Sequence, residues 1–258
     1  MQTANLLLFM RYFICLSYNG SAFCGWQIQE NANSVQAELQ NALSTLFKTP
    51  IQVVGAGRTD TGVNARNYIA HFDTEAPFSI SPTLFYKLNA ILSKAISVHD
   101  IYPVDEQMHA RFSAKSRTYK YYIHTTKDPF CSDFSYFLPP RLNFAKMNEA
   151  AKYFIGEQDF TSLEKLGGGN KTSICNVTHA HWEPLDAPDF ESASHFVFTV
   201  TANRFLRNMV RAMVGSLLDV GFGKREPQWI QQMLSQKNRC AAGHSVPGNA
   251  LFLVEIEY

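Results

Sequence analysis

The stretch Gly55-Ala56-Gly57-Arg58-Thr59-Asp60-Thr61-Gly62-Val63 contains three glycines and two opposite charges that lie two residues apart. A β-type run, residues 51–54, leads into it, and another run, residues 68–72, follows it. This pattern predicts a tight, glycine-bounded loop between two strands, with Asp60 at a strand end. Because glycine permits positive φ and a close approach of the backbone to a ligand, the loop favours a site built around Asp60.

Two nucleotide-binding motifs fit this loop less well, and a purely structural interpretation stays open. A dinucleotide fingerprint requires a third glycine where Asp60 stands and a helix afterwards, and a P-loop requires a Gly-Lys-Ser/Thr ending. The loop has none of these features. The alternative that stays open is a plain hairpin whose aspartate and threonines only satisfy backbone amides.

The segments around the loop predict one αβ unit. Residues 12–18 have the pattern of a buried strand, and the apolar spacing after Asn33 predicts a helix. Asn33 is the expected N-cap, with Gln36 closing a capping box. A helix over 82–93 and a strand over 96–104 follow, so the order β-α-β-β-α-β predicts a split-βαβ, ferredoxin-like unit.

The second half of the chain repeats this plan. Strands are predicted at 117–125, 173–182, 195–201 and 251–257, and helices at 143–155 and 203–220. We therefore expect an α+β protein with two ferredoxin-like halves, residues 10–108 and 109–258. Their antiparallel-rich sheets would pack as one body around a central basic cleft.

Composition limits the class of protein. The chain has 258 residues, 46% of them apolar, and a formal net charge of +1, so a nucleic-acid partner would need a local basic surface. The five cysteines are scattered without a Cys-x-x-Cys, which predicts reduced thiols in a cytoplasmic protein and no metal site. The apolar run 6–10 is too short to cross a bilayer, so no membrane association is expected.

Two groups of cations stand out. The first group consists of Arg111, Lys115, Arg117 and Lys120, which fall within ten residues that contain no acid. Three tyrosines lie among or directly after them, namely Tyr119, Tyr121 and Tyr122. Aromatic rings beside cations are used to stack unpaired bases and neutralise phosphates, although strand aromatics are also common in cores. The second group, Arg204, Arg207 and Arg211, recurs at helical spacing with no acid until Asp219. Because like charges at this spacing repel, an anionic partner accounts for them better than a solvated face does.

Residues 57–65, Gly-Arg-Thr-Asp-Thr-Gly-Val-Asn-Ala, resemble the GRTDxGVHA signature of the tRNA pseudouridine synthase A (TruA) family. Further blocks resemble the family in the same order, namely residues 25–27, 34–36, 110–114, 117–121, 159–162, 205–211 and 251–254. Asn64 stands where the family usually has histidine, which puts an acid–base role of that neighbour in doubt. Because the resemblance begins at Arg11, residues 1–9 are expected to be an extension without function.

The resemblance implies a function and roles for individual residues. The family converts uridine to pseudouridine in the anticodon arm of tRNA, at positions 38 to 40, as a homodimer without a cofactor. Asp60 would be the covalent nucleophile, attacking sugar or base, and Arg211 would pair with it. Tyr119 would pack against the target base, and Arg58 would fill the space that the flipped base leaves.

Other residues complete the expected site. Leu251 and Leu253 alternate on the last strand and would form an apolar floor that excludes water from the intermediate. The expected RNA contacts are Arg111, Lys115, Arg117, Arg204 and Arg207.

Two other classes of function stay open. A non-catalytic ferredoxin-like RNA-binding protein would explain the tyrosines and arginines but leave Asp60 without a role. A metal-dependent hydrolase would use His179 and His181, which are expected on the same strand face as Cys175 and Val177. That pattern has no carboxylate at ligand spacing.

Overall fold

The computed structural model describes residues 10–138, 141–165, 167 and 171–258. The predicted extension, residues 1–9, lies outside this part. The fold is mixed α+β, with one large, mostly antiparallel sheet and helices packed against it. Among the described residues, no helix is both long enough and apolar enough to cross a bilayer.

A single ten-stranded sheet runs through both halves. Its order is β4 (Ile96–Val104), β1 (Met10–Tyr18), β3 (Asn64–Thr74), β10 (Leu251–Glu257), β5 (Ser116–His124), β9 (His195–Ala202), β8 (Ile174–Pro184) and β7 (Gly156–Asp159). Short strands β2 (Val54–Gly55) and β6 (Tyr136–Phe137) pair with β3 and β5. The strands therefore form one continuous sheet, whereas a separate sheet was expected in each half.

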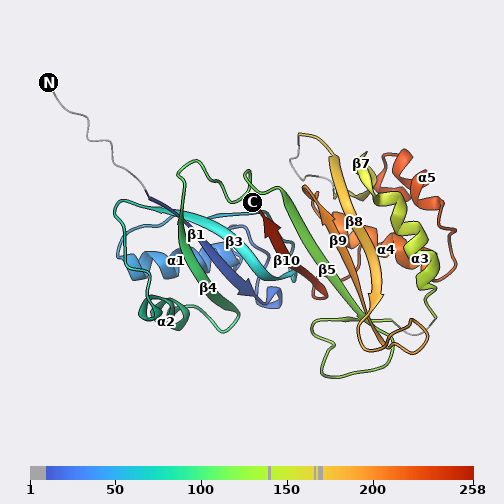
Figure 1. Ribbon diagram of the computed structural model, residues 1–258, viewed down its shortest axis with the longest axis horizontal. Helices are drawn as coiled ribbons and strands as arrows, with labels where there is room; N and C mark the ends of the chain where they lie inside the picture. The colour runs from blue at the N-terminus through green and yellow to red at the C-terminus, as the bar shows by residue number, and fades with distance from the viewer. Residues whose placement is uncertain (1–9, 139–140, 166, 168–170) are drawn as a thin grey trace.

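The last strand makes this join. β10 lies between β3 and β5 in the middle of the molecule (Figure 1), parallel to β3 and antiparallel to β5. Leu253 lies opposite Ala65 at the start of β3 and opposite Tyr119 on β5. β10 therefore links the strand after the Asp60 loop to the strand that carries Tyr119, and these two strands lie on either side of it.

The helices divide between the halves. Figure 1 shows α1 (Val35–Phe47) and α2 (Pro82–Ile91) beside the first half, and α3 (Phe144–Ala151), α4 (Met209–Gly221) and α5 (Trp229–Ser235) beside the second. The predicted cap of α1 is wrong by one residue, because Ser34 accepts the N–H of Ala37. Gln36 does not close a capping box, since its amide donates to Val53 O (2.8 Å) and its carbonyl oxygen accepts from Gln27 (2.9 Å).

The predicted helix 203–220 begins later than expected. α4 starts at Met209, because Asn208 before it takes a left-handed conformation with φ 67°. The N–H of Lys165 also donates to Arg207 O (3.0 Å), which holds the approach to the helix as a loop. Arg204 and Arg207 therefore do not share a helix face with Arg211.

Each half has its own apolar core, and the two cores meet at the central strands. Leu251 belongs to the core of the second half and Leu253 to that of the first. Tyr119 packs against both. The junction between the halves is therefore filled by side chains and holds them in one fixed arrangement.

Candidate active site

The loop ahead of β3 is held from several sides. β2 pairs with β3, so the predicted loop between two strands is confirmed. Thr59 is buried, its hydroxyl lies 2.9 Å from the hydroxyl of Tyr18, and its carbonyl oxygen accepts from Trp26 N (3.2 Å). The N–H of Val63 donates back to Asp60 O (3.1 Å). The backbone that carries Asp60 is therefore fixed before any substrate arrives.

Asn64 ties this loop to two distant segments. Its side chain is 1% exposed, its Oδ1 accepts from Gly20 N (2.8 Å), and its Nδ2 donates to Asn249 O (2.7 Å). A side chain at Gly20 would collide with the backbone of Val63. Both ends of the Asn64 amide are thus used to hold the chain together, which suits a structural residue better than an acid–base group.

Two arginines from the second half face the carboxylate of Asp60. Arg211 Nη1 lies 3.7 Å from Asp60 Oδ2, and Arg207 Nε lies 3.8 Å from Asp60 Oδ1. Arg211 is held in place by a bond from its Nε to Val246 O (2.6 Å). The Asp60 side chain is 25% exposed, so it stays accessible from solvent. The loop before α4 therefore turns Arg207 toward Asp60.

Asp60 lies in a cleft of about 1070 Å³ that both halves line. Among the described lining residues, eight side chains are cationic, namely Arg58, Arg111, Arg117, Lys165, Lys171, Arg204, Arg207 and Arg211. Asp60 is the single carboxylate among them. The chain is almost neutral overall, yet the cleft is strongly positive, as a site for a polyanion requires.

The apolar part of the cleft surrounds Tyr119. Leu251 and Leu253 line it and are almost fully buried. The ring of Phe205 meets the ring of Tyr119 edge to face, with centroids 5.1 Å apart. Burial raises the pKa of Tyr119 to about 12; Arg117 opposes this rise and Asp60 adds to it. The phenol therefore stays neutral near pH 7 and suits contact with a base.

Comparison with known proteins identifies the family. A sequence profile described as tRNA pseudouridine synthase matches residues 150–258. The chain is 50% identical over 248 residues to tRNA pseudouridine synthase A of Parabacteroides distasonis, covering 96% of each protein. It is 39% identical over 254 residues to that of Bacillus subtilis, covering 96% of this chain and 99% of the relative.

The chain belongs to the tRNA pseudouridine synthase A family. The family resemblance predicted from the sequence motifs is thereby confirmed. In this family member, the cleft brings together Asp60, Arg58, Tyr119, Arg211 and the two floor leucines named above.

Arg117 has a different environment from that predicted for a phosphate ligand. Its guanidinium donates to four backbone carbonyls, those of Ala56, Arg111, Ala114 and Asn203. Ala56 begins the Asp60 loop and Asn203 begins the approach to α4. Arg117 therefore braces the two sides of the cleft against each other.

The other predicted RNA contacts differ in position. Arg111 is exposed at the rim, over the ring of Phe112, and Arg204 donates to Thr172 O (3.3 Å). Lys115 is not among the described lining residues, and its Nζ donates to Tyr258 O (2.9 Å). Lys115 precedes β5 and lies beside Tyr258, so its predicted RNA contact would lie outside the described lining of the cleft.

Sequence reasoning missed three lining residues. Lys165 and Lys171 flank the glycine-rich stretch 167–170, and Phe205 lies within the stretch 203–220 that was predicted as a helix. No spacing pattern marks the two lysines. The flanking of a glycine-rich stretch by cations was the one available signal for them.

The histidine pair proposed for a metal-dependent hydrolase does not share a face with Cys175 and Val177. A β-bulge in β8 shifts the register between Val177 and His179. Cys175 and Val177 are buried, whereas His179 and His181 are exposed. That grouping is therefore wrong, and neither histidine is among the described residues that line the cleft.

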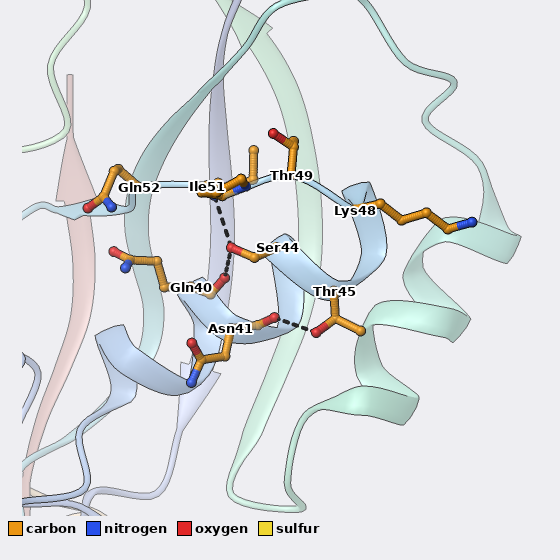
Figure 2. Close-up of a pocket in the computed structure, with 9 residues that line it drawn as sticks. Gln40, Asn41, Ser44, Thr45, Lys48, Thr49, Ile51 and Gln52 are labelled. Carbon is orange, nitrogen blue, oxygen red and sulfur yellow. Dashed lines mark hydrogen bonds between the residues drawn. The ribbon is translucent and has the colours of Figure 1, made fainter.

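A second hollow lies beside the end of α1 (Figure 2). Its described lining consists of Gln40, Asn41, Ser44, Thr45, Lys48, Thr49, Pro50, Ile51 and Gln52. Ser44 Oγ donates to Gln40 O (2.7 Å) and accepts from Ile51 N (2.9 Å). The hydroxyl is committed to holding the chain turn after α1, so this hollow offers no activated group.

Proposed function

We propose that this chain isomerises uridine to pseudouridine in the anticodon stem-loop of tRNA, at positions 38 to 40, with Asp60 as the nucleophile. Membership of the family supports the reaction and the tRNA substrate. The observation that carries the role of Asp60 is its place as the single carboxylate among the described residues of a cleft with eight cations. A glycoside hydrolase would need a second carboxyl group nearby.

The reaction needs one nucleophile and a protected base. The bond between uracil N1 and ribose C1′ breaks, the base turns, and a bond forms between C5 and C1′. The C5 proton leaves to solvent and N1 gains a proton, so no oxidant or energy source is consumed. Asp60 attacks the ribose or the base and leaves again when the product forms.

The cleft has parts for each of these tasks. The target uridine leaves its stack and lies against Tyr119, with Leu251 and Leu253 below it. Arg58, exposed at the rim of the cleft, occupies the place that the base leaves. Arg211 Nη1 and Arg207 Nε lie 3.7 and 3.8 Å from the carboxylate oxygens of Asp60, close enough to attract this group without hydrogen-bonding to it.

The same proposal includes two ferredoxin-like halves and a homodimer. The first half has the strand order β4-β1-β3-β2 and the second β10-β5-β9-β8. Numbered within each half, both correspond to 4-1-3-2, the order expected of a split-βαβ unit, which supports the division near residue 108. Two copies would share one tRNA in the cytoplasm, and sedimentation of the protein with and without tRNA tests this.

The decisive experiment uses tRNA transcribed with uridine tritiated at C5. A synthase releases tritium in proportion to pseudouridine formed, and the product maps to positions 38 to 40. Transcripts with cytidine at all three positions are the control and should release none. Binding without release would favour the alternative, a non-catalytic RNA-binding protein, and release from the control transcript would contradict the proposed positions.

A further inference from the structure

Three side chains of types that can hold a metal ion meet at one end of the sheet in the second half. Asp128 and Cys131 lie in the loop after β5, and His195 is the first residue of β9. The Sγ of Cys131 and Oδ2 of Asp128 each lie 3.8 Å from Nε2 of His195. One donor atom from each residue lies within 4.8 Å of the others. None of the three is among the described residues that line the Asp60 cleft.

These spacings are close to those of a tetrahedral zinc site. With Zn–S of about 2.3 Å and Zn–N or Zn–O of about 2.0 Å, sulfur and nitrogen lie about 3.6 Å apart and nitrogen and oxygen about 3.3 Å apart. The two distances from Nε2 of His195 are 3.8 Å each, so they need to shrink by about 0.2 Å to the sulfur and about 0.5 Å to the oxygen, and the donor atoms of Cys131 and Asp128 lie within 4.8 Å of each other. The side chains of His195 and Asp128 are 31% and 33% exposed, so water has access to a fourth position.

Asp186 holds the histidine ring in the orientation that a metal needs. Its Oδ2 lies 3.0 Å from Nδ1 of His195, and it also accepts from the hydroxyl and N–H of Ser194. An ionised carboxylate only accepts hydrogen bonds, so Nδ1 carries the proton shared with Asp186. In the neutral ring the lone pair of Nε2 then faces Asp128 and Cys131. A carboxylate behind a histidine ligand is the usual second layer of a zinc site.

We propose that Asp128, Cys131 and His195 bind one Zn²⁺ ion, with water as the fourth ligand. The mixed sulfur, nitrogen and oxygen donors suit zinc, whereas magnesium and calcium prefer oxygen alone. On binding, the Cys131 thiol releases its proton to solvent and the thiolate bonds to the metal. The spacing evades sequence inspection, because Asp128 and Cys131 are local but His195 comes from another strand.

The site would fasten a loop that touches the Asp60 region. Ser132 O and Asp133 O, in the same loop, accept from Nδ2 of Asn249 at 3.3 and 3.2 Å. Asn249 O in turn accepts from Asn64, which begins β3 directly after the Asp60 loop. Zinc therefore stabilises the fold at this junction and takes no part in the chemistry.

The test starts from full-length protein stripped with chelator and titrated with Zn²⁺ or Co²⁺. We expect one equivalent of Zn²⁺ to bind and to raise Tm. Co²⁺ should give a near-ultraviolet thiolate-to-metal charge-transfer band. Cys131→Ser should abolish that band and weaken zinc binding at least about 10-fold, and Asp186→Asn should weaken it about 10- to 100-fold.

Matched controls separate this site from other thiols and histidines. Cys240→Ser removes an exposed thiol, and His181→Gln removes an exposed histidine, so both variants should bind zinc as the wild type does. If Cys131→Ser does not fold, Asp128→Asn should weaken binding while the charge-transfer band persists. Absence of the band in the wild type, or equal zinc affinity in the folded ligand variants, would overturn the proposal. His195 would then serve only as a hydrogen-bond partner of Asp186 and Cys131.

Discussion

Two aspartates, one near each end of β3, both face arginine side chains, but the two Asp–Arg contacts differ in length. Asp73, near the end of β3, receives two hydrogen bonds of 2.8 Å from Arg11. Asp60, ahead of the start of β3, has its nearest arginine nitrogens at 3.7 and 3.8 Å. These longer contacts exceed hydrogen-bond range, so the oxygens of Asp60 keep their lone pairs available. We call the hydrogen-bonded Asp73–Arg11 contact the closed pair, and it ties β3 to β1. We call the longer contacts of Asp60 the open pair, because they leave its carboxylate oxygens accessible to a substrate.

The difference comes from what else each arginine binds. Arg11 also donates to Glu106 O (2.8 Å) and Met108 O (3.1 Å), and these bonds leave two of its nitrogens aimed at Asp73. Arg211 directs its Nε to Val246 O, which keeps its guanidinium near Asp60 without joining it. Positive charge beside a nucleophile thus need not block its attack.

The largest effect is expected from Asp60→Asn, which keeps the shape and removes the nucleophile. Turnover should fall at least about 10³-fold, since an amide does not form the covalent intermediate. Affinity for tRNA should change by no more than about threefold, because phosphate contacts come from the cationic residues. Tritium release and filter binding measure the two quantities. Substantial turnover by this variant would remove Asp60 from its role.

Arg211→Lys should have the second largest effect. Lysine keeps the charge, but its single nitrogen cannot hold Val246 O and face Asp60 as the fork of arginine does. We expect kcat to fall about 10²-fold with little change in KM, as for loss of an electrostatic contact at the reacting group. A rise in KM with unchanged kcat would instead assign Arg211 to substrate binding.

Some helices and strands could be predicted from the sequence with correct bounds, and others could not. The order of elements in the first half was predicted, because their apolar periodicity and turn residues are local. The strand predicted near 96–104 matches β4, whereas β3 is longer than the run 68–72. The helix 203–220 was predicted too long, since the apolar pattern continues through Phe205 and Leu206 although Asn208 breaks the helix. A left-handed residue other than glycine leaves little mark in a sequence.

The residues that line the cleft also divide into those that a local sequence motif marks and those that it does not. Asp60 and Tyr119 stand in motifs and were found, and they do line one cleft. Lys165, Lys171 and Phe205 come to it only through the path of the chain between strands. The insertion of β10 between β3 and β5 was also not predicted, because a parallel pair between a strand of the first half and the last strand leaves no local signal.

Arg207→Ala tests the contact between Asp60 and Arg207 through its more exposed partner. The Arg207 side chain is 48% exposed, so it can meet a phosphate as well as Asp60. We expect tRNA binding to weaken about 10-fold and the slope of log affinity against log salt to fall by about 1. Arg225→Ala, at a surface arginine stacked on Trp229, is the control. An unchanged slope would limit Arg207 to its contact with Asp60.

Asp73→Asn should have the smallest effect. In contrast to Asp60→Asn, it should lower stability and leave turnover unchanged. Its carboxylate is 36% exposed, so solvent screening limits the loss of stability to about 1 kcal/mol, while kcat stays unchanged below Tm. The hydrogen bonds from Arg11 lower the pKa of Asp73. A lowered carboxyl pKa adds stability above the unfolded value of about 3.9, and this is lost as pH falls through the folded value.

The difference in unfolding free energy between wild type and Asp73→Asn should therefore be constant from pH 7 to 5 and shrink below about pH 4. Burial lowers the pKa of the neighbouring His71 to about 4. The unfolded state takes up that proton first, so both proteins lose stability as pH falls from 6.5. This loss cancels in the difference down to about pH 5, where folded His71 is neutral in both proteins, whereas nearer pH 4 the Asp73 charge also acts on His71. Denaturant unfolding at each pH measures the difference. A difference that grows as pH falls would show that the closed pair does not stabilise the fold through its charge.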